Sequence, residues 1–381
     1  MNQRIYFDNA ATTPLHPLVI EEMARLMKNH YGNPSSIHEE GRIVKAAIED
    51  ARKRIARHLN ASVGEIFFTS GGTESTNMAL KCSVRDLGVQ RIITSPIEHH
   101  CVSHSLKELA KQGVQVDYVE VDHRGHIKME TLEKLLLIKE KKTLVSIMHA
   151  NNEVGTMIDL DAVAELCNAT GALFHSDTVQ TVGHFPIDVS KTKISFLTGG
   201  AHKFHGPKGV GFVYINGDNI IAPLLDGGSQ ERNMRGGTEN VYGIVGMAKA
   251  LDLAYENLEE DIVYIKSLRR TFLNKLQENF AGIKVNGDVD GRSLYTVLSV
   301  SFPRTDKSDM LLMAMDIHGI SASGGSACSS GAEQQSHVLN AIGVDPSRKT
   351  IRFSFSKMNT MEEVETVIEK LKTIIPTRVE A

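Results

Sequence analysis

The sequence of 381 residues has few cysteines and no long apolar run, and both absences narrow the possibilities. Its four cysteines are too few and too scattered for a disulfide framework in a chain of this size, so we expect reduced thiols. No apolar run approaches the roughly 20 residues that span a bilayer, and residues 1–4 lack the apolar core of a signal peptide. These features predict a cytoplasmic protein.

The sequence also lacks a strongly charged region. Its formal net charge is -4, and its charged runs are short and mixed, such as residues 139–142, which are typical of a solvated helix end. This balance argues against nucleic acid as the main partner. The chain has neither an internal repeat nor a low-complexity tract, so its length suits a large α/β domain with a smaller second one.

Short apolar runs alternate with helical patterns through the middle of the chain. Helical stretches of about 10–15 residues separate these runs, which indicates a mostly parallel sheet with helices on both faces. The runs lie at residues 66–69, 91–94, 114–121, 144–148, 173–175 and 194–197. We therefore predict a large domain over residues 15–250 and a smaller α+β domain over residues 251–381, which residues 1–14 join.

A loop between two apolar runs, residues 194–197 and 210–215, carries the most informative lysine. Lys203 follows His202 in this loop, and glycines lie on both sides of the pair. A lysine that such a loop holds partly desolvated can act as a nucleophile and form a Schiff base with an aldehyde. A surface lysine in a hairpin is the alternative, and only neighbouring residues can decide between the two.

Polar residues also follow the ends of other predicted strands, where open α/β sheets bind their ligands. Gly71, Gly72 and Thr73 lie between a strand and a helix, which makes them a candidate phosphate cup, although such a glycine pair often serves only the fold. Neither a Walker-type lysine nor the third glycine of a dinucleotide-binding fingerprint follows, so we exclude both classes. The other polar strand-end residues include His99, Asn152, Asp177 and Gln180.

Asp177 ends a strand with no cationic residue beside it in the sequence, so a buried position would require a partner. The protonated nitrogen of a pyridine ring would be a suitable partner for this carboxylate. A phosphate cup, a Schiff-base lysine and a carboxylate together are what pyridoxal 5'-phosphate requires, because this cofactor withdraws electrons only while its ring nitrogen stays protonated. A helix cap is the alternative role of Asp177, and a turn is the alternative role of Asn152.

The histidines near residue 100 allow a second interpretation. His99, His100, Cys101 and His104 together resemble a metal cluster, but no second group of cysteines and histidines lies at zinc spacing. A histidine stacked on an aromatic cofactor suits the end of a strand better. We therefore predict no metal site.

Cys328 lies in a glycine- and serine-rich stretch, residues 321–331, and has no large apolar neighbour. A thiol in such a loop is expected to be accessible and mobile, which suits a nucleophile that moves from one reaction partner to another. Arg352 alternates with apolar residues on a short predicted strand and could bind a carboxylate in a bidentate manner, unless it is an ordinary surface arginine. The other cysteines lie in or next to predicted helices and are interpreted as packing residues: Cys82, Cys101 and Cys167.

These motifs resemble the NifS/IscS-type cysteine desulfurases, which belong to the class V aminotransferase group of fold-type I pyridoxal-phosphate enzymes. The resemblance covers nearly the whole chain. Its motifs lie at residues 6–13, 32–36, 69–75, 98–99, 149–153, 177–180, 201–203, 234–238, 325–328 and 351–354. The long glycine- and serine-rich stretch around Cys328 is more similar to the NifS/IscS branch than to the SufS branch, whose loop is short.

The resemblance implies a role for each site residue. Lys203 would hold pyridoxal 5'-phosphate, Asp177 would pair with its ring nitrogen, and Gln180 would bond its phenolic oxygen, while His99 would stack on the ring. The family usually has serine where this chain has Gly200, so one hydroxyl contact to the phosphate is missing. The implied phosphate contacts are Gly72, Thr73, His202 and, in the site of the other subunit, Thr238. The implied contacts to the substrate carboxylate are Asn152, Arg352 and Asn33.

The same resemblance implies the conversion of L-cysteine to L-alanine. Lys203 would take the Cα proton, and Cys328 as a thiolate would attack the substrate sulfur and keep it as a persulfide. A U-type iron–sulfur scaffold or a tRNA-thiolation protein would accept the sulfur, and two subunits of a homodimer would form each site. A class V aminotransferase or selenocysteine lyase is the alternative among enzymes, and a noncatalytic thiol or metal carrier is the alternative outside them.

Overall fold

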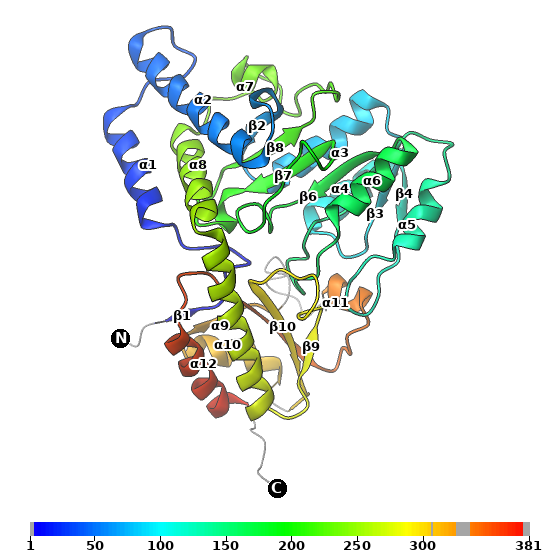
Figure 1. The fold of residues 1–381 in the computed structure, drawn as a ribbon, viewed down its shortest axis with the longest axis vertical. Coiled ribbons are helices and arrows are strands. Elements are labelled where there is room, and N and C mark those ends of the chain that lie inside the picture. The colour runs from blue at the N-terminus through cyan, green and yellow to red at the C-terminus, as the bar shows by residue number, and fades with distance from the viewer. Residues whose placement is uncertain (1–3, 306–307, 325–335, 376–381) are drawn as a thin grey trace.

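The computed structural model describes residues 4–305, 308–324 and 336–375 (Figure 1). Cys328 and the rest of its motif therefore lie outside the described residues. The described helices are α1 (Pro17–Asn29), α2 (Glu39–Leu59), α3 (Gly72–Leu87), α4 (His100–Lys111), α5 (Met129–Leu136), α6 (Leu160–Thr170), α7 (Gln230–Asn233), α8 (Val241–Glu256), α9 (Leu258–Asn279), α10 (Leu311–Ile317), α11 (His337–Ala341) and α12 (Met361–Ile374).

A seven-stranded sheet lies at the centre of the larger, upper part of the molecule in Figure 1. Its order is β2-β8-β7-β6-β5-β3-β4, and β8 runs in the direction opposite to the other strands of this sheet. The prediction of a mostly parallel sheet is thus confirmed. The strands are β2 (Ile66–Thr69), β3 (Arg91–Thr94), β4 (Gln115–Tyr118), β5 (Thr143–Ser146), β6 (Leu173–Asp177), β7 (Phe196–Gly200) and β8 (Gly211–Ile215).

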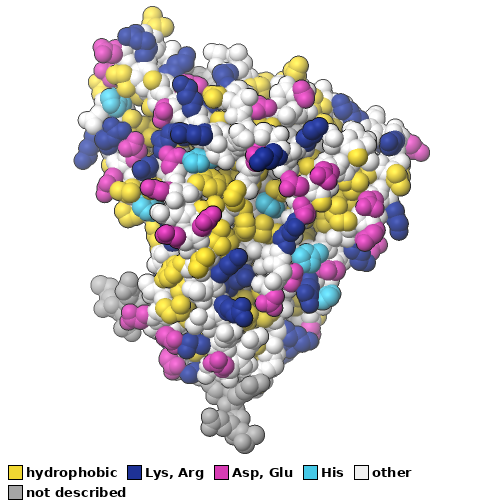
Figure 2. Space-filling model, in the orientation of Figure 1, with side chains coloured by type: hydrophobic (Ala, Val, Ile, Leu, Met, Phe, Trp, Pro, Cys, Tyr) yellow, Lys and Arg dark blue, Asp and Glu magenta, His cyan; other side chains and the backbone are white. Residues whose placement is uncertain are grey.

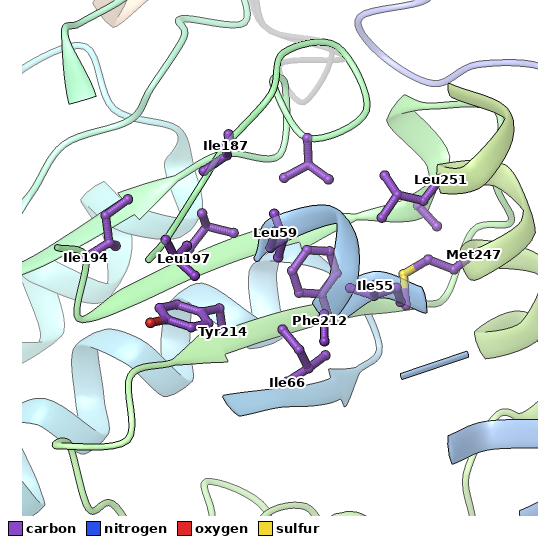
Figure 3. Close-up of a cluster of buried hydrophobic side chains, with 14 of the residues drawn as sticks. Ile55, Leu59, Ile66, Ile187, Ile194, Leu197, Phe212, Tyr214, Met247 and Leu251 are labelled. Atoms are coloured by element: carbon purple, nitrogen blue, oxygen red, sulfur yellow. The ribbon is translucent and has the colours of Figure 1, made fainter. Parts of the chain in front are cut away.

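The sheet is covered on both faces because successive side chains of a strand point to opposite sides. On β8, Phe212 and Tyr214 pack toward α2 and α8, whereas Val213 packs toward α3. Figure 3 shows the hydrophobic core on the α2 and α8 side of the sheet, where side chains of these two helices pack against the strands. Its labelled members are Ile55, Leu59, Ile66, Ile187, Ile194, Leu197, Phe212, Tyr214, Met247 and Leu251.

A second hydrophobic core lies in the lower part of Figure 1, where β10 pairs antiparallel with both β9 and β12. Phe7, near the N-terminus, packs there against Phe272 of α9 and against Phe355. The pair β1–β11 also brings the N-terminal segment to this core. The division into two domains stays a prediction, which the two separate cores support. The remaining strands are β1 (Ile5–Tyr6), β9 (Lys284–Asn286), β10 (Val297–Phe302), β11 (Ile320–Ser321) and β12 (Lys349–Ser354).

The surface carries charges of both signs. On the face that Figure 2 shows, lysine and arginine side chains are interspersed with aspartate and glutamate side chains over both parts of the molecule. Within the described residues, every helix is either too short or too polar to cross a membrane.

Candidate active site

A cavity of about 260 Å³ lies at the carboxyl end of the central sheet. This volume is close to the lower end of the roughly 300–1,000 Å³ typical of small-molecule sites. Nearly all the residues predicted from strand ends meet there, although they are distant in sequence. The predicted residues that line it are Gly72, Thr73, His99, Asn152, Asp177, Gln180, His202, Lys203 and Arg352, joined by Ala10, Ala11, Cys101, Met148 and Val179.

Lys203 reaches the cavity from a short 3₁₀ turn, Ala201–Lys203, that follows β7 directly. Its Nζ donates to the carbonyl oxygens of Ala10 at 2.6 Å and Ala11 at 2.9 Å. Backbone and hydroxyl bonds from Thr13 to the carbonyl of His202 hold the same two segments together. The amine of Lys203 is therefore fixed at the cavity wall, where it can bond to an aldehyde carbon.

The phosphate cup forms where β2 passes into α3. Gly71 has a φ of 152°, which non-glycine residues rarely adopt, and α3 begins at Gly72. A Cβ on Gly72 would lie 2.6 Å from Cγ2 of Val179, so any larger residue here would displace Val179, which also lines the cavity. The first N–H groups of a helix have no partner within the helix and attract anions. Gly72 and Thr73 carry these groups and line the cavity, so the cup fits a phosphate.

Asp177 occupies the end of β6 and is buried. Its Oδ1 accepts the N–H of Val179 at 3.0 Å. Burial raises the pKa of Asp177, although the bond from the N–H of Val179 and the charge of Lys203 act in the opposite direction. A carboxyl group in this position would be stabilised as the anion by a further cation, and a protonated pyridine nitrogen would supply that charge.

His99 caps the N-terminus of α4, and its Nδ1 accepts the N–H of Cys101 at 3.2 Å. Burial lowers the pKa of His99, so the ring is neutral and carries its proton on Nε2. One nitrogen, one sulfur and one oxygen from His99, Cys101 and Asp177 lie within 4.8 Å of one another. A metal ion could use these atoms, but the cup, the lysine and the aspartate together fit pyridoxal phosphate.

Cys101, interpreted from the sequence as a packing residue, packs against a hydrophobic core and also lines the cavity. Cys82 and Cys167 are buried in the hydrophobic cores, whereas Cys101 lines the cavity with its Sγ 3.0 Å from Nδ1 of His99. Burial raises the pKa of Cys101 well above its usual range, so the group remains a thiol. Only its nearness to His99 in the sequence could have indicated this position.

Arg352 is fully buried, which excludes the alternative of an ordinary surface arginine. Its Nη2 donates to Oδ1 of Asp8 at 2.9 Å, and its Nη1 donates to the carbonyl of Asn152 at 2.9 Å. Its Nε has no hydrogen-bond partner among the described residues. Ser323 also donates to Oδ1 of Asp8 and pairs with the backbone of Arg352, so the segment that leads toward Cys328 starts beside this guanidinium.

Two further residues hold the walls in place. Gln180 donates from Nε2 to the carbonyl of Ala10 at 3.1 Å. His184, which the sequence analysis missed, donates from Nε2 to the carbonyl of Lys203 at 3.0 Å. Burial lowers the pKa of His184 and, together with the nearby Lys203, lowers the pKa of His202 to about 4, so both rings are neutral at pH 7.

Three of the predicted residues do not line this cavity in the described chain. Asn33 is exposed, and its Oδ1 accepts the N–H of Ser35 at 2.9 Å. Thr238 is also exposed, as a residue that reaches another subunit would be. Cys328 lies outside the described residues. The roles of these three residues remain predictions.

Comparisons with known proteins show which family this sequence and fold resemble. The sequence matches the aminotransferase class-V family over residues 5–367. A cysteine desulfurase IscS of Dictyoglomus turgidum is 42% identical, over 99% of this chain and 97% of the relative. A solved NifS-like protein is 41% identical with a TM-score of 0.90, over 98% and 99% of the two chains. The structure of SspA in complex with cysteine is 31% identical with a TM-score of 0.81, over 93% of this chain and 100% of that one.

The fold and the site define a member of the class V aminotransferase family. Within it, the chain belongs to the cysteine desulfurases of the IscS and NifS type.

Proposed function

We propose that this protein is a pyridoxal-phosphate-dependent cysteine desulfurase that converts L-cysteine to L-alanine and takes the sulfur onto Cys328 as a persulfide. The observation that carries the proposal is the meeting of Lys203, Asp177 and the α3 phosphate cup in one cavity. The relationship to cysteine desulfurases over the full chain supports the choice of L-cysteine over other amino acids.

Each wall of the cavity would hold one part of pyridoxal 5'-phosphate. Gly72 and Thr73 would bind the phosphate, Asp177 would pair with the ring nitrogen, and Lys203 would make the covalent link. His99 would stack on the ring, and Gln180 would bond its phenolic oxygen. When bound, this group supplies the electron-withdrawing ring that makes a proton on the substrate Cα acidic.

The protein side chains would then bind the substrate and move its proton. Nζ of Lys203 is held at the cavity wall, where it would take the Cα proton of the bound substrate. Arg352 would bind the substrate carboxylate through donors that do not contact Asp8, and Asn152 would assist. Asn33 is proposed as a further carboxylate contact.

The sulfur step would use Cys328, whose thiolate would attack the substrate sulfur and form the S–S bond of a persulfide. The C–S bond would break with its electron pair left on Cβ, which would take up a proton before alanine is released. Ser323, bonded to Asp8 beside Arg352, would place the start of the Cys328 segment near the substrate. We propose a U-type iron–sulfur scaffold or another persulfide-accepting protein as the partner. The free thiols of Cys82, Cys101 and Cys167 fit a reducing compartment, so we propose the cytoplasm.

The protein is further proposed to work as a homodimer, in which Thr238 would contact the phosphate in the partner subunit's site and His202 the phosphate in its own. The exposed position of Thr238 supports this arrangement. Light scattering at assay concentration measures it directly, and a fully active monomer would exclude it.

The activity is tested by incubating the full-length protein with pyridoxal 5'-phosphate, L-cysteine and dithiothreitol. Equal amounts of alanine and sulfide are expected. Transamination products without sulfide would indicate an ordinary aminotransferase. Turnover of L-selenocysteine alone would indicate a selenocysteine lyase.

A further inference from the structure

A short segment beside the phosphate cup has an unusual backbone. Residues 229–237, which we call the clamp segment, contain α7. Three consecutive non-glycine residues in it, Glu231, Arg232 and Asn233, have positive φ angles of 46°, 57° and 66°. Each such residue costs about 1–2 kcal/mol relative to the right-handed region, so the segment must be held by its side chains.

One end of the clamp segment is fixed to β2, the edge strand that leads into the cup. The carboxylate of Glu231 accepts from Nη1 and Nη2 of Arg52 at 2.8 Å and 2.7 Å, and both side chains are buried. The same carboxylate accepts the N–H of Phe68 at 2.8 Å, and the guanidinium of Arg52 donates to the carbonyl of Ile66 at 2.9 Å. This pair thus occupies the open edge of β2.

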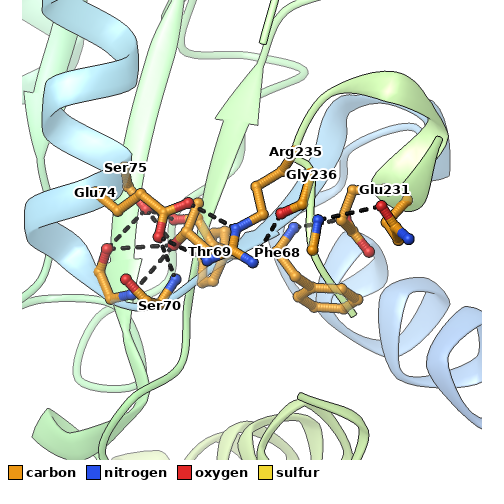
Figure 4. A network of polar contacts seen from close by, with 12 residues as sticks. Phe68, Thr69, Ser70, Glu74, Ser75, Glu231, Arg235 and Gly236 are labelled. Carbon is orange, nitrogen blue, oxygen red and sulfur yellow. Dashed lines mark hydrogen bonds and ion pairs between the residues drawn. The ribbon is translucent and has the colours of Figure 1, made fainter. Parts of the chain in front are cut away.

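The other end of the clamp segment is bonded to Glu74, the residue that directly follows the cup (Figure 4). Nε and Nη2 of Arg235 donate to Oε1 and Oε2 of Glu74 at 3.0 Å and 3.3 Å. Glu74 lies in the first turn of α3, directly after Thr73, and its Oε2 also accepts the N–H of Ser70 at 2.9 Å. Burial opposes ionisation of Glu74, but the bonds from Arg235 and Ser70 outweigh it and lower its pKa.

This arrangement poses an electrostatic problem that Arg235 solves. A carboxylate in the first turn of α3 interacts favourably with the helix dipole, yet it also lies beside the site where a phosphate would bind. Two anions so close repel each other strongly when partly buried. The guanidinium of Arg235 offsets the charge of Glu74 and leaves the helix N–H groups for the phosphate.

We propose that Arg235 is a positioning residue for the cofactor phosphate, which acts through Glu74 by neutralising its charge and holding it against Ser70. This inference rests on the proposed function. It predicts that removing Arg235 weakens phosphate binding and that removing the charge of Glu74 as well restores it.

The test is a titration of full-length protein, freed of cofactor, with pyridoxal 5'-phosphate and separately with pyridoxal, which lacks the phosphate. In Arg235→Gln, the affinity for pyridoxal 5'-phosphate should fall about tenfold, while the affinity for pyridoxal stays within about twofold. In Glu74→Gln, the affinity for pyridoxal 5'-phosphate should be unchanged or higher. In the double variant, this affinity should return to within about threefold of the wild type, a coupling that independent effects would not produce.

Arg85→Gln is the matched control, because Arg85 forms an ion pair with Asp86 at the other end of α3. It should bind both compounds like the wild type. Equal losses for pyridoxal and pyridoxal 5'-phosphate in Arg235→Gln, or no recovery in the double variant, would show that the ion pair serves only the fold. If Arg235→Gln does not fold, weakened phosphate binding in Glu74→Gln alone would overturn the inference. If the wild type binds the two compounds equally, the proposed cofactor site itself fails.

Discussion

Nζ of Lys203 donates to the carbonyl oxygen of Ala10 at 2.6 Å, across a sequence separation of 193 residues. The bond joins the loop after β7 to the N-terminal segment, so residues near the start of the chain form a wall of the cavity. Since the same segment carries Asp8, which pairs with Arg352, it connects the proposed covalent site to the proposed carboxylate site.

Replacement of this lysine tests the centre of the site. In Lys203→Ala, borohydride should no longer fix pyridoxal phosphate on the protein, and sulfide production should be lost, because both the covalent link and the proposed base are gone. Noncovalent binding of the cofactor can persist through the cup. Normal turnover in this variant would contradict the assignment of Lys203.

Asp177→Asn tests the pairing with the ring nitrogen. A neutral amide cannot hold that nitrogen protonated as well as a carboxylate, so we expect the turnover rate to fall by about 10²–10⁴-fold. The cofactor should still bind, because the cup and Lys203 are unchanged. Steady-state rates at saturating L-cysteine measure the effect, and a rate equal to that of the wild type would exclude the pairing.

The fold was predictable to a large extent because buried parallel strands are short, nearly continuous apolar runs. The run at residues 91–94 coincides with β3, which pairs parallel with β4 and β5. The run at residues 66–69 coincides with β2, which pairs antiparallel with β8, and the strand–loop–strand interpretation around Lys203 is confirmed by the antiparallel pair β7–β8. The strand order was not predictable. The insertion of β8 between β2 and β7 depends on contacts that leave no periodic signal in the sequence.

The site was predictable where it consists of side chains at strand ends. His99, Asn152 and Asp177 were identified in this way, and all line one cavity. The backbone carbonyls of Ala10 and Ala11 could not be found, because every residue has a carbonyl and the contact is between distant segments. The position of the Cys101 thiol at the cavity was not predicted either, since it depends on the direction in which α4 starts.

Gly200 offers a test by gain of affinity. A Cβ at this position would lie 3.5 Å from Cγ1 of Val179 and 3.7 Å from the N atom of Gly72, both ordinary contacts, and its φ of -141° suits any residue. Gly200→Ser should therefore fit and place a hydroxyl near the cup. We expect about fivefold tighter binding of pyridoxal 5'-phosphate, which corresponds to about 1 kcal/mol for one added hydrogen bond.

Two substitutions accompany this test. Gly200→Ala fits the same space without a hydroxyl and should leave the affinity unchanged. Gly199→Ser should lower the melting temperature, because its Cβ would clash with the ring of Phe212. If the serine and alanine variants at position 200 bind the cofactor equally well, the missing hydroxyl contact is not a feature of this site.

Glu98 gives a prediction about pH. Burial raises its pKa to about 8 from 4.5, although bonds from Ser95 and the N–H of Met148 favour the anion. Because the folded pKa lies above the unfolded one, the folded state binds more protons between these values. The stabilisation is complete below about pH 4.5 and is lost as the pH rises toward 8, with a slope of up to about 1.4 kcal/mol per pH unit.

Urea unfolding at pH 5, 6.5 and 8 measures this dependence. In Glu98→Gln, which cannot ionise, the contribution is absent, so the stability of the wild type relative to the variant should decrease steadily as the pH rises. A difference between the two proteins that is constant over this range would mean that Glu98 is ionised throughout.

The last prediction separates a desulfurase from an aminotransferase, because only the sulfur step requires a thiol. In Cys328→Ala, the residues that line the cofactor cavity are all unchanged, so the cofactor should bind normally and its absorbance should still respond to L-cysteine. Turnover should then stop without persulfide or sulfide, since no nucleophile remains to take the sulfur.

The other thiols of the chain are the controls for this prediction. Cys82→Ala and Cys167→Ala should retain the full rate and lose only stability, because both side chains are buried in hydrophobic cores. Cys101→Ala should also form persulfide, but its contact with His99 is lost, so a change in cofactor absorbance is expected there. If Cys328→Ala made alanine and sulfide at the wild-type rate while these controls behaved as stated, the sulfur would leave the substrate without a protein thiol, and a lyase mechanism would replace the persulfide.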